Sequence, residues 1–407
     1  MKVAVIGGGA AGLMAAYSAA VNGNEVTVYD KNEKCGKKIY ITGKGRCNFT
    51  NAVPPAEFLQ HVVNNGKFLT GAIYGFTPQD SIDFFENGKM PVKVERGNRA
   101  FPVSDKASDV TKCLENYCKS AGVRICLNEE VLDYTILNST VSDIITSVGT
   151  YSVDKIIVCT GGMSYPSTGS TGDGYKFALK AGHTIVNPVP ALCGLNISGD
   201  FYKNLQGLTL KNVRLSAEYS GKVIFDEMGE MLFTHFGISG PIVLSLSSVI
   251  NRLDLGKLKI YLDLKPALDS QTLDKRLLRD FSQFSNKSIH NCLKNLLPVS
   301  MIEIVLNKAG ISVDKKVNLI TRAERAALLT TLKKFDMIVS SLRSFNEAII
   351  TSGGVNVKEI NPKTMESKLV KGLYFCGEVL DVDAFTGGFN LQIAFSTGFA
   401  AGNSIRD

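Results

Sequence analysis

The chain has 407 residues, of which 44% are hydrophobic and 20% charged, and its formal net charge at pH 7 is +7. This composition predicts a globular protein with a large core and two or three domains, and it excludes a fibrous or low-complexity chain. No apolar run approaches the roughly 18 residues of a membrane span, and the first expected strand already begins at residue 2. We therefore expect no membrane segment, no signal peptide and a cytoplasmic location.

The N-terminal segment has the pattern of a dinucleotide-binding βαβ unit. A strand over residues 2–6 leads into a G-x-G-x-x-G turn at 7–12. An apolar helix over 13–21 follows, and then a second strand over 25–29 that ends on Asp30. The full context makes this motif stronger than an isolated glycine match.

Each residue of the turn has a physical role. Gly7 permits the tight turn, Gly9 lets a pyrophosphate approach the backbone, and Gly12 lets helix and strand pack closely. The helix N-terminus offers free N–H groups to phosphate. Asp30 would accept hydrogen bonds from the ribose hydroxyls. The residues expected to hold the nucleotide here are Gly7, Gly9, Ala10, Ala11, Gly12 and Asp30. This motif alone does not distinguish FAD from NAD.

The segment that follows, up to Asn51, is rich in glycine and basic residues. Its glycines permit close backbone approach, and its cations suit a pyrophosphate and a reduced flavin. The expected cofactor contacts are Lys31, Lys38, Gly45, Arg46, Cys47 and Asn48. A solvated loop is the alternative for the lysines. Cys47 could be attached to the flavin, but a non-covalent neighbour is the expected state.

Nine cysteines without a C-x-x-C motif indicate reduced thiols rather than a disulfide framework or a zinc site. Cys35 and Cys47 lie twelve residues apart across the glycine-rich loop, which disfavours a dithiol relay. The four histidines lack metal-ligand spacing, so we expect no metal.

Two later segments resemble parts of glutathione-reductase-like FAD folds. Glu129-Glu130-Val131 stands where such folds pair a backbone amide with adenine, and Val131 is our candidate. An apolar strand over 153–158 ends in Cys159 and then in Thr160, Gly161 and Gly162, which we assign to the turn beneath the adenosine half.

The middle of the chain changes character. Residues 194–264 alternate as antiparallel strands do, and 269–334 have helical periodicity. Pro298 is expected to close one helix, and Thr321-x-x-Glu324 to form a capping box. Strand-like sequence returns at 336–350.

The expected fold is α/β, with a Rossmann-like FAD-binding domain made of two chain segments. It carries an inserted antiparallel β-domain, which itself carries an inserted helical bundle. The expected boundaries are 1–193 with 349–407 for the FAD domain, 194–266 with 335–348 for the β-domain, and 267–334 for the helical insert.

A second cofactor signal lies near the C-terminus. A strand from Leu373 ends in Gly-Glu, and a loop and a helix rich in small residues follow. Single-chain FAD folds hold the ribityl chain and the flavin O2/N1 edge in this way, which favours FAD. The expected contacts are Gly377, Glu378, Asp381, Gly388, Asn390, Leu391 and Gln392. The sequence has only one βαβ motif, so we expect no separate domain for NAD(P)H. As a possible co-substrate, NAD(P)H would visit the flavin only transiently.

Spaced motifs run from one end of the chain to the other, namely Gly36–Lys38 with Thr42–Asn51, Arg99–Ser104, Tyr165–Gly174, Gly229–Pro241 and Gly377–Gln392. They resemble the bacterial FAD-binding family that contains aminoacetone oxidase and the flavoprotein of bile-acid dehydroxylation. The resemblance covers the whole chain and implies the nested architecture and FAD. The family holds more than one activity.

The substrate is expected between the FAD domain and the insert, because pockets favour domain junctions. The candidate lining residues are Thr234, His235, Ser239, Tyr165, Arg99 and Asn390. His235, Tyr165 and Arg99 are the candidate catalytic residues. His235 could move a proton near neutral pH, and a structural role for it is weighted equally. For the other three histidines, 61, 183 and 290, a structural role is favoured.

The leading hypothesis is an FAD-dependent oxidoreductase that uses NAD(P)H to reduce an unsaturated or carbonyl-conjugated small molecule. If an enone is reduced, Tyr165 or His235 would stabilise the enolate. One alternative is an amine oxidase that produces hydrogen peroxide, with Asp381 or Asp383 binding the amine. Another is a flavin-holding protein that binds RNA or a partner through its helical insert.

Residues 265–334 contain thirteen Lys and Arg but six Asp and Glu, an excess that equals the net charge of the whole chain. This surface could steer anionic substrates or bind nucleic acid. The charges are scattered, and no aromatic residues lie between them to stack on bases. We therefore favour the interpretation that they lie on solvated faces of helices. The oligomeric state is left open.

Overall fold

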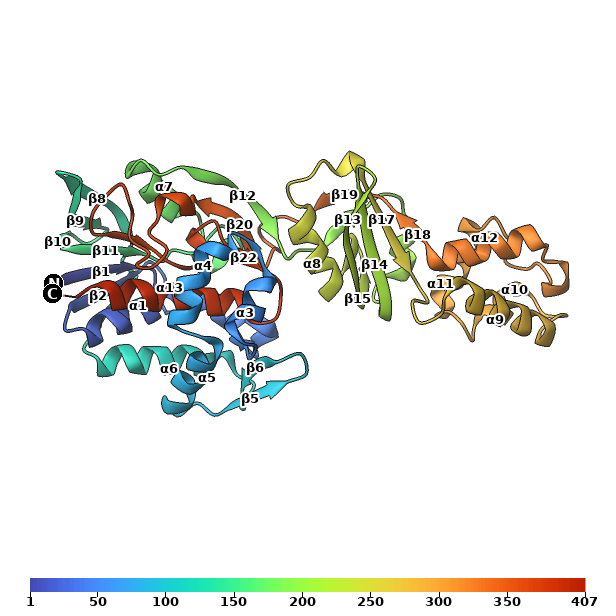
Figure 1. The fold of residues 1–407 in the computed structure, drawn as a ribbon, viewed down its shortest axis with the longest axis horizontal. Coiled ribbons are helices and arrows are strands. Elements are labelled where there is room, and N and C mark those ends of the chain that lie inside the picture. The colour runs from blue at the N-terminus through green and yellow to red at the C-terminus, as the bar shows by residue number, and fades with distance from the viewer. Residues whose placement is uncertain (407) are drawn as a thin grey trace. The chain divides into compact units, whose positions relative to one another are not determined.

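The computed structural model describes residues 1–406 and divides into two compact units (Figure 1). The first contains Met1–Ala191 and the chain from Phe345 onward, and the second contains Leu192–Ser344. Each unit has its own hydrophobic core. Within residues 1–406, no helix is long and apolar enough to cross a membrane. The three-domain boundaries expected from the sequence stay a prediction.

The first unit is built on a five-stranded parallel sheet in the order β21-β11-β1-β2-β7. Its strands are β1 (Lys2–Ile6), β2 (Glu25–Asp30), β7 (Arg124–Leu127), β11 (Lys155–Val158) and β21 (Leu373–Phe375). The central strands are almost continuously apolar, because a parallel sheet is covered on both faces. The N-terminal βαβ unit and the strand before Thr160 are therefore confirmed.

Two helices from opposite chain ends pack together beside this sheet. These are α1 (Ala10–Val21) and α13 (Phe389–Ser404). A Cβ at Gly398 would overlap the carbonyl oxygen of Ala11, and one at Gly402 would overlap that of Ala15. The two glycines, one turn apart, therefore allow the C-terminal helix to approach α1 closely.

Smaller elements complete the first unit. Its antiparallel sheets are β8 (Val131–Leu137) with β9 (Thr140–Thr146) and β10 (Thr150–Ser152), β12 (Ile185–Ala191) with β20 (Ile350–Val355), β4 (Val62–Asn64) with β22 (Asp383–Ala384), and β3 (Thr50–Asn51) with β6 (Arg99–Pro102) and β5 (Val92–Glu95). Its other helices are α2 (Lys37–Ile41), α3 (Pro55–Phe58), α4 (Gly66–Gly75), α5 (Pro78–Asn87), α6 (Ala107–Ser120) and α7 (Asp173–Lys180).

The second unit contains a seven-stranded antiparallel sheet in the order β18-β17-β14-β15-β16-β13-β19. Its strands are β13 (Leu195–Ile197), β14 (Thr209–Tyr219), β15 (Lys222–Thr234), β16 (Gly237–Ser239), β17 (Leu258–Asp263), β18 (Phe335–Met337) and β19 (Val339–Leu342). Helix α8 (Pro241–Ile250) packs on β15. The expected α/β class, with a parallel core and a separate antiparallel sheet, is confirmed.

Four helices follow β17 in the second unit. They are α9 (Ser270–Gln283), α10 (Ile289–Leu293), α11 (Val299–Lys308) and α12 (Arg322–Lys333). The capping box of Thr321 and Glu324 at the start of α12 is confirmed. The prediction that Pro298 closes a helix was wrong, because α10 already ends at Leu293 and Pro298 precedes α11. Proline lacks an N–H and is tolerated where a helix begins.

His183, just after α7, joins two distant segments in the first unit. Only 2% of its surface is exposed. Its Nδ1 lies 3.1 Å from Glu359 Oε2, and its Nε2 lies 2.8 Å from Ser367 Oγ. Burial lowers the pKa of His183, although Glu359 opposes this shift. The structural role favoured for this histidine agrees with its burial.

We expect His183 to make the protein less stable at acidic pH. The unfolded chain binds a proton near the ordinary histidine pKa of about 6.5, whereas the buried ring has a lower pKa, so stability is lost as pH falls below about 6.5. Denaturant unfolding across this pH range should therefore show a smaller pH dependence in His183→Gln than in the wild type. His290→Gln, on α10, is the control. An unchanged pH dependence in His183→Gln would contradict this role.

Candidate functional site

The glycine turn after β1 has the shape required of a phosphate-binding cradle. Gly7 has φ +103°, and a Cβ there would lie 2.6 Å from the Cys159 carbonyl oxygen. A Cβ at Gly12 would overlap the Gly7 carbonyl oxygen. A Cβ at Gly9 would meet nothing within 4 Å, so the N-terminus of α1 faces open space. No side chain caps this helix end, which leaves its N–H groups and positive dipole end available for a phosphate.

Asp30 holds this turn in place from the end of β2. Its Oδ2 accepts a hydrogen bond of 2.8 Å from the Gly8 amide, and its Oδ1 accepts two from Asn32. Asp30 as a whole is 8% exposed. Binding of ribose hydroxyls by Asp30 stays a prediction. The adjacent Lys31 forms a 2.6 Å ion pair with Asp173, which compensates its charge within the protein.

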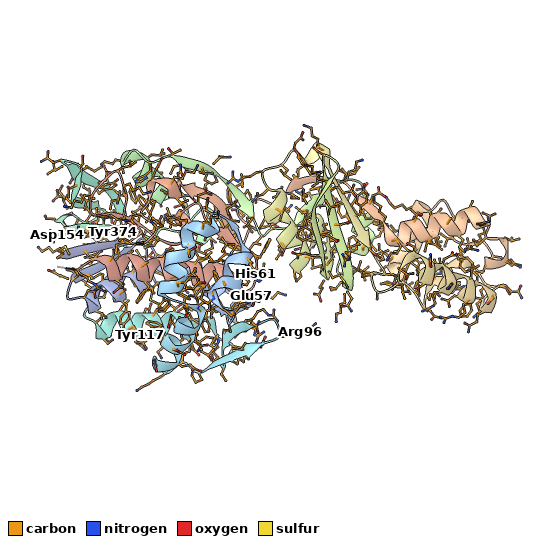
Figure 2. All side chains as sticks on the ribbon, viewed as in Figure 1. Glu57, His61, Arg96, Tyr117, Asp154 and Tyr374 are labelled. Carbon is orange, nitrogen blue, oxygen red and sulfur yellow. The ribbon has the colours of Figure 1, made fainter. Side chains whose placement is uncertain are left out.

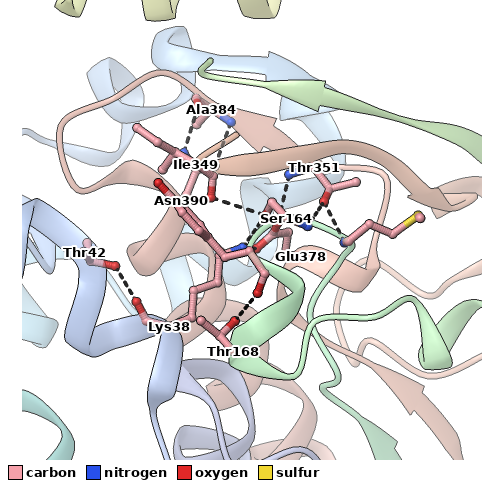
Figure 3. A network of polar contacts seen from close by, with 11 residues as sticks. Lys38, Thr42, Ser164, Thr168, Ile349, Thr351, Glu378, Ala384 and Asn390 are labelled. Carbon is pink, nitrogen blue, oxygen red and sulfur yellow. Dashed lines mark hydrogen bonds and ion pairs between the residues drawn. The ribbon is translucent and has the colours of Figure 1, made fainter. Parts of the chain in front are cut away.

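A polar network connects the C-terminal loop with α2 and with the turn that follows β11 (Figure 3). The ammonium group of Lys38 lies 2.6 Å from Glu378 Oε2 and donates to Ser164 Oγ. Ser164 Oγ and the Thr351 amide both donate to Glu378 Oε1, each at 2.8 Å. Two predicted residues far apart in sequence, Lys38 and Glu378, are thus brought together. Sequence analysis missed Ser164 and Thr351, because neither lies at a distinctive position of a glycine motif.

Hydrogen bonds and close packing by residues at the start of α13 hold the loop before this helix in place. Asn390 Oδ1 accepts from the Ala384 amide, and Asn390 Nδ2 donates to the Ala384 carbonyl. Gly388 approaches β3 closely, since a Cβ there would lie 2.5 Å from the Thr50 carbonyl oxygen. Gln392 is fully buried and makes four hydrogen bonds inside the protein. A direct cofactor contact by the Gln392 side chain stays a prediction.

The two acidic residues proposed for amine binding are engaged in this region. Asp383 is fully buried, and its Oδ1 accepts hydrogen bonds from Asn64 and Ser352. Asp381 accepts through its carboxylate and its backbone carbonyl from Asn65. Nearby, the ring of His61 stacks on Phe389 at 4.4 Å, which places this histidine against the start of α13 (Figure 2).

Four polar atoms on or directly next to the expected cofactor segments are buried but have no hydrogen-bond partner within residues 1–406. They are Asn48 Oδ1, Asn51 Oδ1, Thr160 Oγ1 and Tyr175 OH. Buried polar groups are normally paired, so such atoms call for a bound group. Hydroxyl and amide side chains are suited to the hydroxyls and phosphate oxygens of a dinucleotide. Together with the open cradle at Gly9, they fit FAD.

This interpretation makes a prediction for Thr160. Thr160→Val keeps the shape but removes the unpaired hydroxyl, so the cofactor-free protein should be no less stable than the wild type. Affinity for FAD should fall by about fivefold to tenfold, which corresponds to one lost hydrogen bond of about 1 kcal/mol. Thermal unfolding of the apoprotein and FAD fluorescence titration measure the two effects. Thr397→Val is the control, because Thr397 Oγ1 is paired in the protein and its loss should destabilise the apoprotein. Unchanged FAD affinity in Thr160→Val would count against the assignment.

Arg46 forms ion pairs within the protein, and the neighbouring Cys47 is buried. The Arg46 guanidinium binds Glu95 and Asp105 and lies 4.3 Å from the ring centre of Phe101. Its charge is therefore compensated by two carboxylates. Cys47 is fully buried with φ +58°, and burial raises the pKa of its thiol. The roles of both residues toward the cofactor stay predictions.

The remaining predicted cofactor residues also lie in the first unit. Val131 begins β8 and is buried. Gly45, Gly161 and Gly377 have positive φ. A Cβ at Gly162 would lie 2.5 Å from Thr351 Oγ1, beside the Glu378 network. Ala10, Ala11 and Leu391 lie in the first turn of α1 or of α13.

The three candidate catalytic residues divide between the two units. Tyr165 is half-buried with φ +51°, an uncommon conformation for an aromatic residue, and burial raises its pKa. Arg99 is exposed, and its Nε donates to the Arg96 carbonyl. His235 is exposed in the second unit, between Thr234, whose buried hydroxyl has no partner within residues 1–406, and Phe236. Their assembly into one site stays a prediction.

The nine cysteines are all free thiols. Among residues 1–406, no group of three or more His, Cys, Asp or Glu residues is arranged to hold a metal ion.

The cradle, the C-terminal loop and the parallel sheet define a Rossmann-type protein whose site fits FAD. The chain belongs to the HI0933-like family, since the family model described as HI0933-like protein Rossmann domain matches residues 1–404. The expected family resemblance is confirmed.

Whole-length relatives carry two kinds of activity. The 3-dehydro-bile acid delta(4,6)-reductase of Clostridium scindens is 30% identical over 100% of this chain and 99% of its own length. The ribosomal RNA dihydrouridine synthase of Haemophilus influenzae is 31% identical over 98% of this chain and 97% of its own. The 3-ketosteroid-delta4-(5alpha)-dehydrogenase of Rhodococcus jostii shares the fold, with a TM-score of 0.53 at 13% identity over 99% of this chain and 96% of that one.

Proposed function

We propose that the protein is an FAD-dependent reductase of a carbon–carbon double bond conjugated with a carbonyl group, with NAD(P)H as the hydride donor. In this reaction the β-carbon gains a hydride and the α-carbon a proton, so the substrate gains two hydrogens and NAD(P)H becomes NAD(P)+. The observation that carries the proposal is the whole-length similarity to two reductive relatives. A delta(4,6) 3-oxo steroid acid and the uracil ring of uridine both contain such a conjugated bond.

When bound, FAD supplies reversible hydride exchange at N5. Residues of the first unit would hold it. The uncapped N-terminus of α1 would bind the pyrophosphate, and the unpaired hydroxyls of Thr160 and Tyr175 would supply hydrogen bonds. Tyr165 is our candidate proton donor, because its phenol carries a proton at neutral pH and its side chain is half-buried in the first unit. We propose non-covalent binding, since Cys47 is fully buried.

An anaerobic titration with NADPH and NADH tests the proposal. Either donor should bleach the visible flavin absorption, and Tyr165→Phe should bleach like the wild type but be reoxidised more slowly by a conjugated acceptor. Failure of both donors in a protein that dithionite reduces would count against the reductase. Bleaching by small amines, with peroxide formed in air, would instead support the amine oxidase alternative.

A further inference from the structure

Tyr165 has a backbone conformation that its local sequence opposes. Its φ of +51° and ψ of +64° lie in the left-handed region, which is uncommon for an aromatic residue. The next residue is Pro166, and a residue before proline prefers extended backbone. Strain of this kind persists only where the surrounding structure imposes it, and it occurs often at functional sites.

The backbone of Tyr165 is held on both sides. Its amide donates to the Phe345 carbonyl at 2.9 Å, and its carbonyl accepts from the amide and the hydroxyl of Thr168, each at 2.8 Å. The half-buried phenol makes no hydrogen bond within residues 1–406. The backbone groups are thus fully bonded, whereas the phenol has its O–H available for a ligand.

Thr351 fixes the turn that leads into Tyr165 (Figure 3). From β20, its Oγ1 accepts from the Met163 amide at 2.8 Å and from the Ser164 amide at 3.0 Å. Ser164 and Thr351 are both fully buried. One hydroxyl therefore satisfies two backbone amides, and its loss would leave both donors unpaired in the interior.

The same threonine connects this turn with Glu378. The Thr351 amide and Ser164 Oγ donate to Glu378 Oε1, each at 2.8 Å, while Lys38 binds Glu378 Oε2. Lys38 and Glu378 are both predicted cofactor contacts. Thr351 is therefore bonded to the turn through its hydroxyl and to the expected cofactor site through its amide, which fixes the two relative to each other.

We propose that Thr351 is a positioning residue, whose hydroxyl holds the turn so that the Tyr165 phenol donates a hydrogen bond to the carbonyl oxygen of the bound acceptor. This inference rests on the proposed function, because hydride addition to a conjugated carbonyl compound places negative charge on that oxygen. A donor that is already in place stabilises the charge without reorganisation, and a displacement of about 1 Å removes much of this effect. This role also accounts for the strained backbone of Tyr165.

The test measures binding of 4-chlorophenol to the holoenzyme. Its phenolate oxygen resembles the enolate oxygen, and a phenolate stacked on oxidised flavin gives a long-wavelength absorption band that reports affinity without turnover. The variants are Tyr165→Phe, Thr351→Val, their combination and Thr351→Ser, which keeps the hydroxyl. Thr351→Cys, whose sulfur is a weaker acceptor, replaces Thr351→Val if the latter is obtained without FAD.

The control for this test is Thr146→Val. The buried Thr146 hydroxyl, in β9, likewise accepts from two backbone amides, those of Val148 and Gly149. It makes no hydrogen bond to the turn at Tyr165, so the control measures the general effect of removing such a hydroxyl from the first unit.

Tyr165→Phe should bind 4-chlorophenol about tenfold more weakly, the effect of losing one hydrogen bond to a charged oxygen. Thr351→Val should bind it about threefold to tenfold more weakly, whereas Thr351→Ser and Thr146→Val should stay within about twofold of the wild type. In the Tyr165→Phe background, Thr351→Val should have no further effect, because its contribution passes through the phenol. No absorption band in the wild type, full additivity of the two substitutions, or equal weakening in Thr146→Val would overturn the inference.

The same protein samples separate this inference from the proposed function. If NAD(P)H bleaches the flavin and a conjugated ketone reoxidises it, but Thr351→Val binds 4-chlorophenol like the wild type, the reductase stands and the positioning role fails. If Thr351 and Tyr165 are coupled in binding but no conjugated acceptor is reduced, the positioning of the phenol stands while the proposed reaction fails.

Discussion

Replacing Gly12 by Ala should yield a protein that folds poorly and carries no FAD. A Cβ at this position would overlap the Gly7 carbonyl oxygen, and neither backbone segment is free to move because α1 packs on β1 and α13 packs on α1. Overpacking of this kind typically costs about 1–3 kcal/mol, and a backbone clash belongs at or above the upper end of that range. Denaturant unfolding of the apoprotein and the flavin absorption of the purified protein measure the result.

Gly9→Ala provides the contrasting variant. Its Cβ meets nothing within 4 Å, so the apoprotein should lose no more than about 1 kcal/mol, the cost of a poorer helix cap. FAD affinity should nevertheless fall about tenfold or more, because the methyl group occupies the approach of the pyrophosphate. Gly75→Ala, at the end of α4, also meets nothing and should change neither quantity. Normal FAD content in Gly9→Ala would show that the open space at this helix end is not the phosphate site.

Gln392→Leu should cost about 3 kcal/mol or more of unfolding free energy. The amide oxygen of Gln392 accepts from Thr50 and Ser81, and its nitrogen donates to the Phe76 carbonyl and to Ser396. The leucine would leave these partners buried without their bonds, at about 1–3 kcal/mol for each group that cannot find another. The variant tests whether this residue joins α13 to β3 and α5.

The control for this variant is Gln79→Leu, an exposed residue of α5 whose amide reaches only Asp83. It should change stability by less than about 0.5 kcal/mol. Urea unfolding of the apoproteins compares the two. If Gln392→Leu unfolds like the wild type and loses only FAD affinity, then Gln392 serves the cofactor rather than the fold.

Local sequence patterns predicted those parts of the protein that are formed by residues close together in the sequence. The strand, turn and helix of residues 2–21 and the capping box at Thr321 lie in continuous segments, and both are present. The fold class also followed from the sequence, because apolar strands and alternating strands belong to different sheets.

The pairing of side chains across long sequence separations was not predictable in this way. Lys38 and Glu378 are 340 residues apart, and no local signal indicates that they form an ion pair. Arg46 was predicted to lie beside the cofactor. The sequence around it gives no sign that its guanidinium group forms ion pairs with Glu95 and Asp105. Similarly, the composition showed that residues 265–334 carry an excess of positive charge. Which of these basic residues form ion pairs with carboxylates could be learned only from the three-dimensional structure.

The most direct test of the proposed reaction is a single-turnover experiment on the anaerobically reduced protein. The reduced enzyme is mixed with a uridine-containing RNA hairpin or with a conjugated 3-oxo steroid, the visible flavin absorption is followed, and the acceptor is then analysed by mass spectrometry. We predict that one acceptor reoxidises the flavin and gains two hydrogens in an equal amount. Reoxidation by oxygen alone, with hydrogen peroxide formed and both acceptors unchanged, would contradict the account.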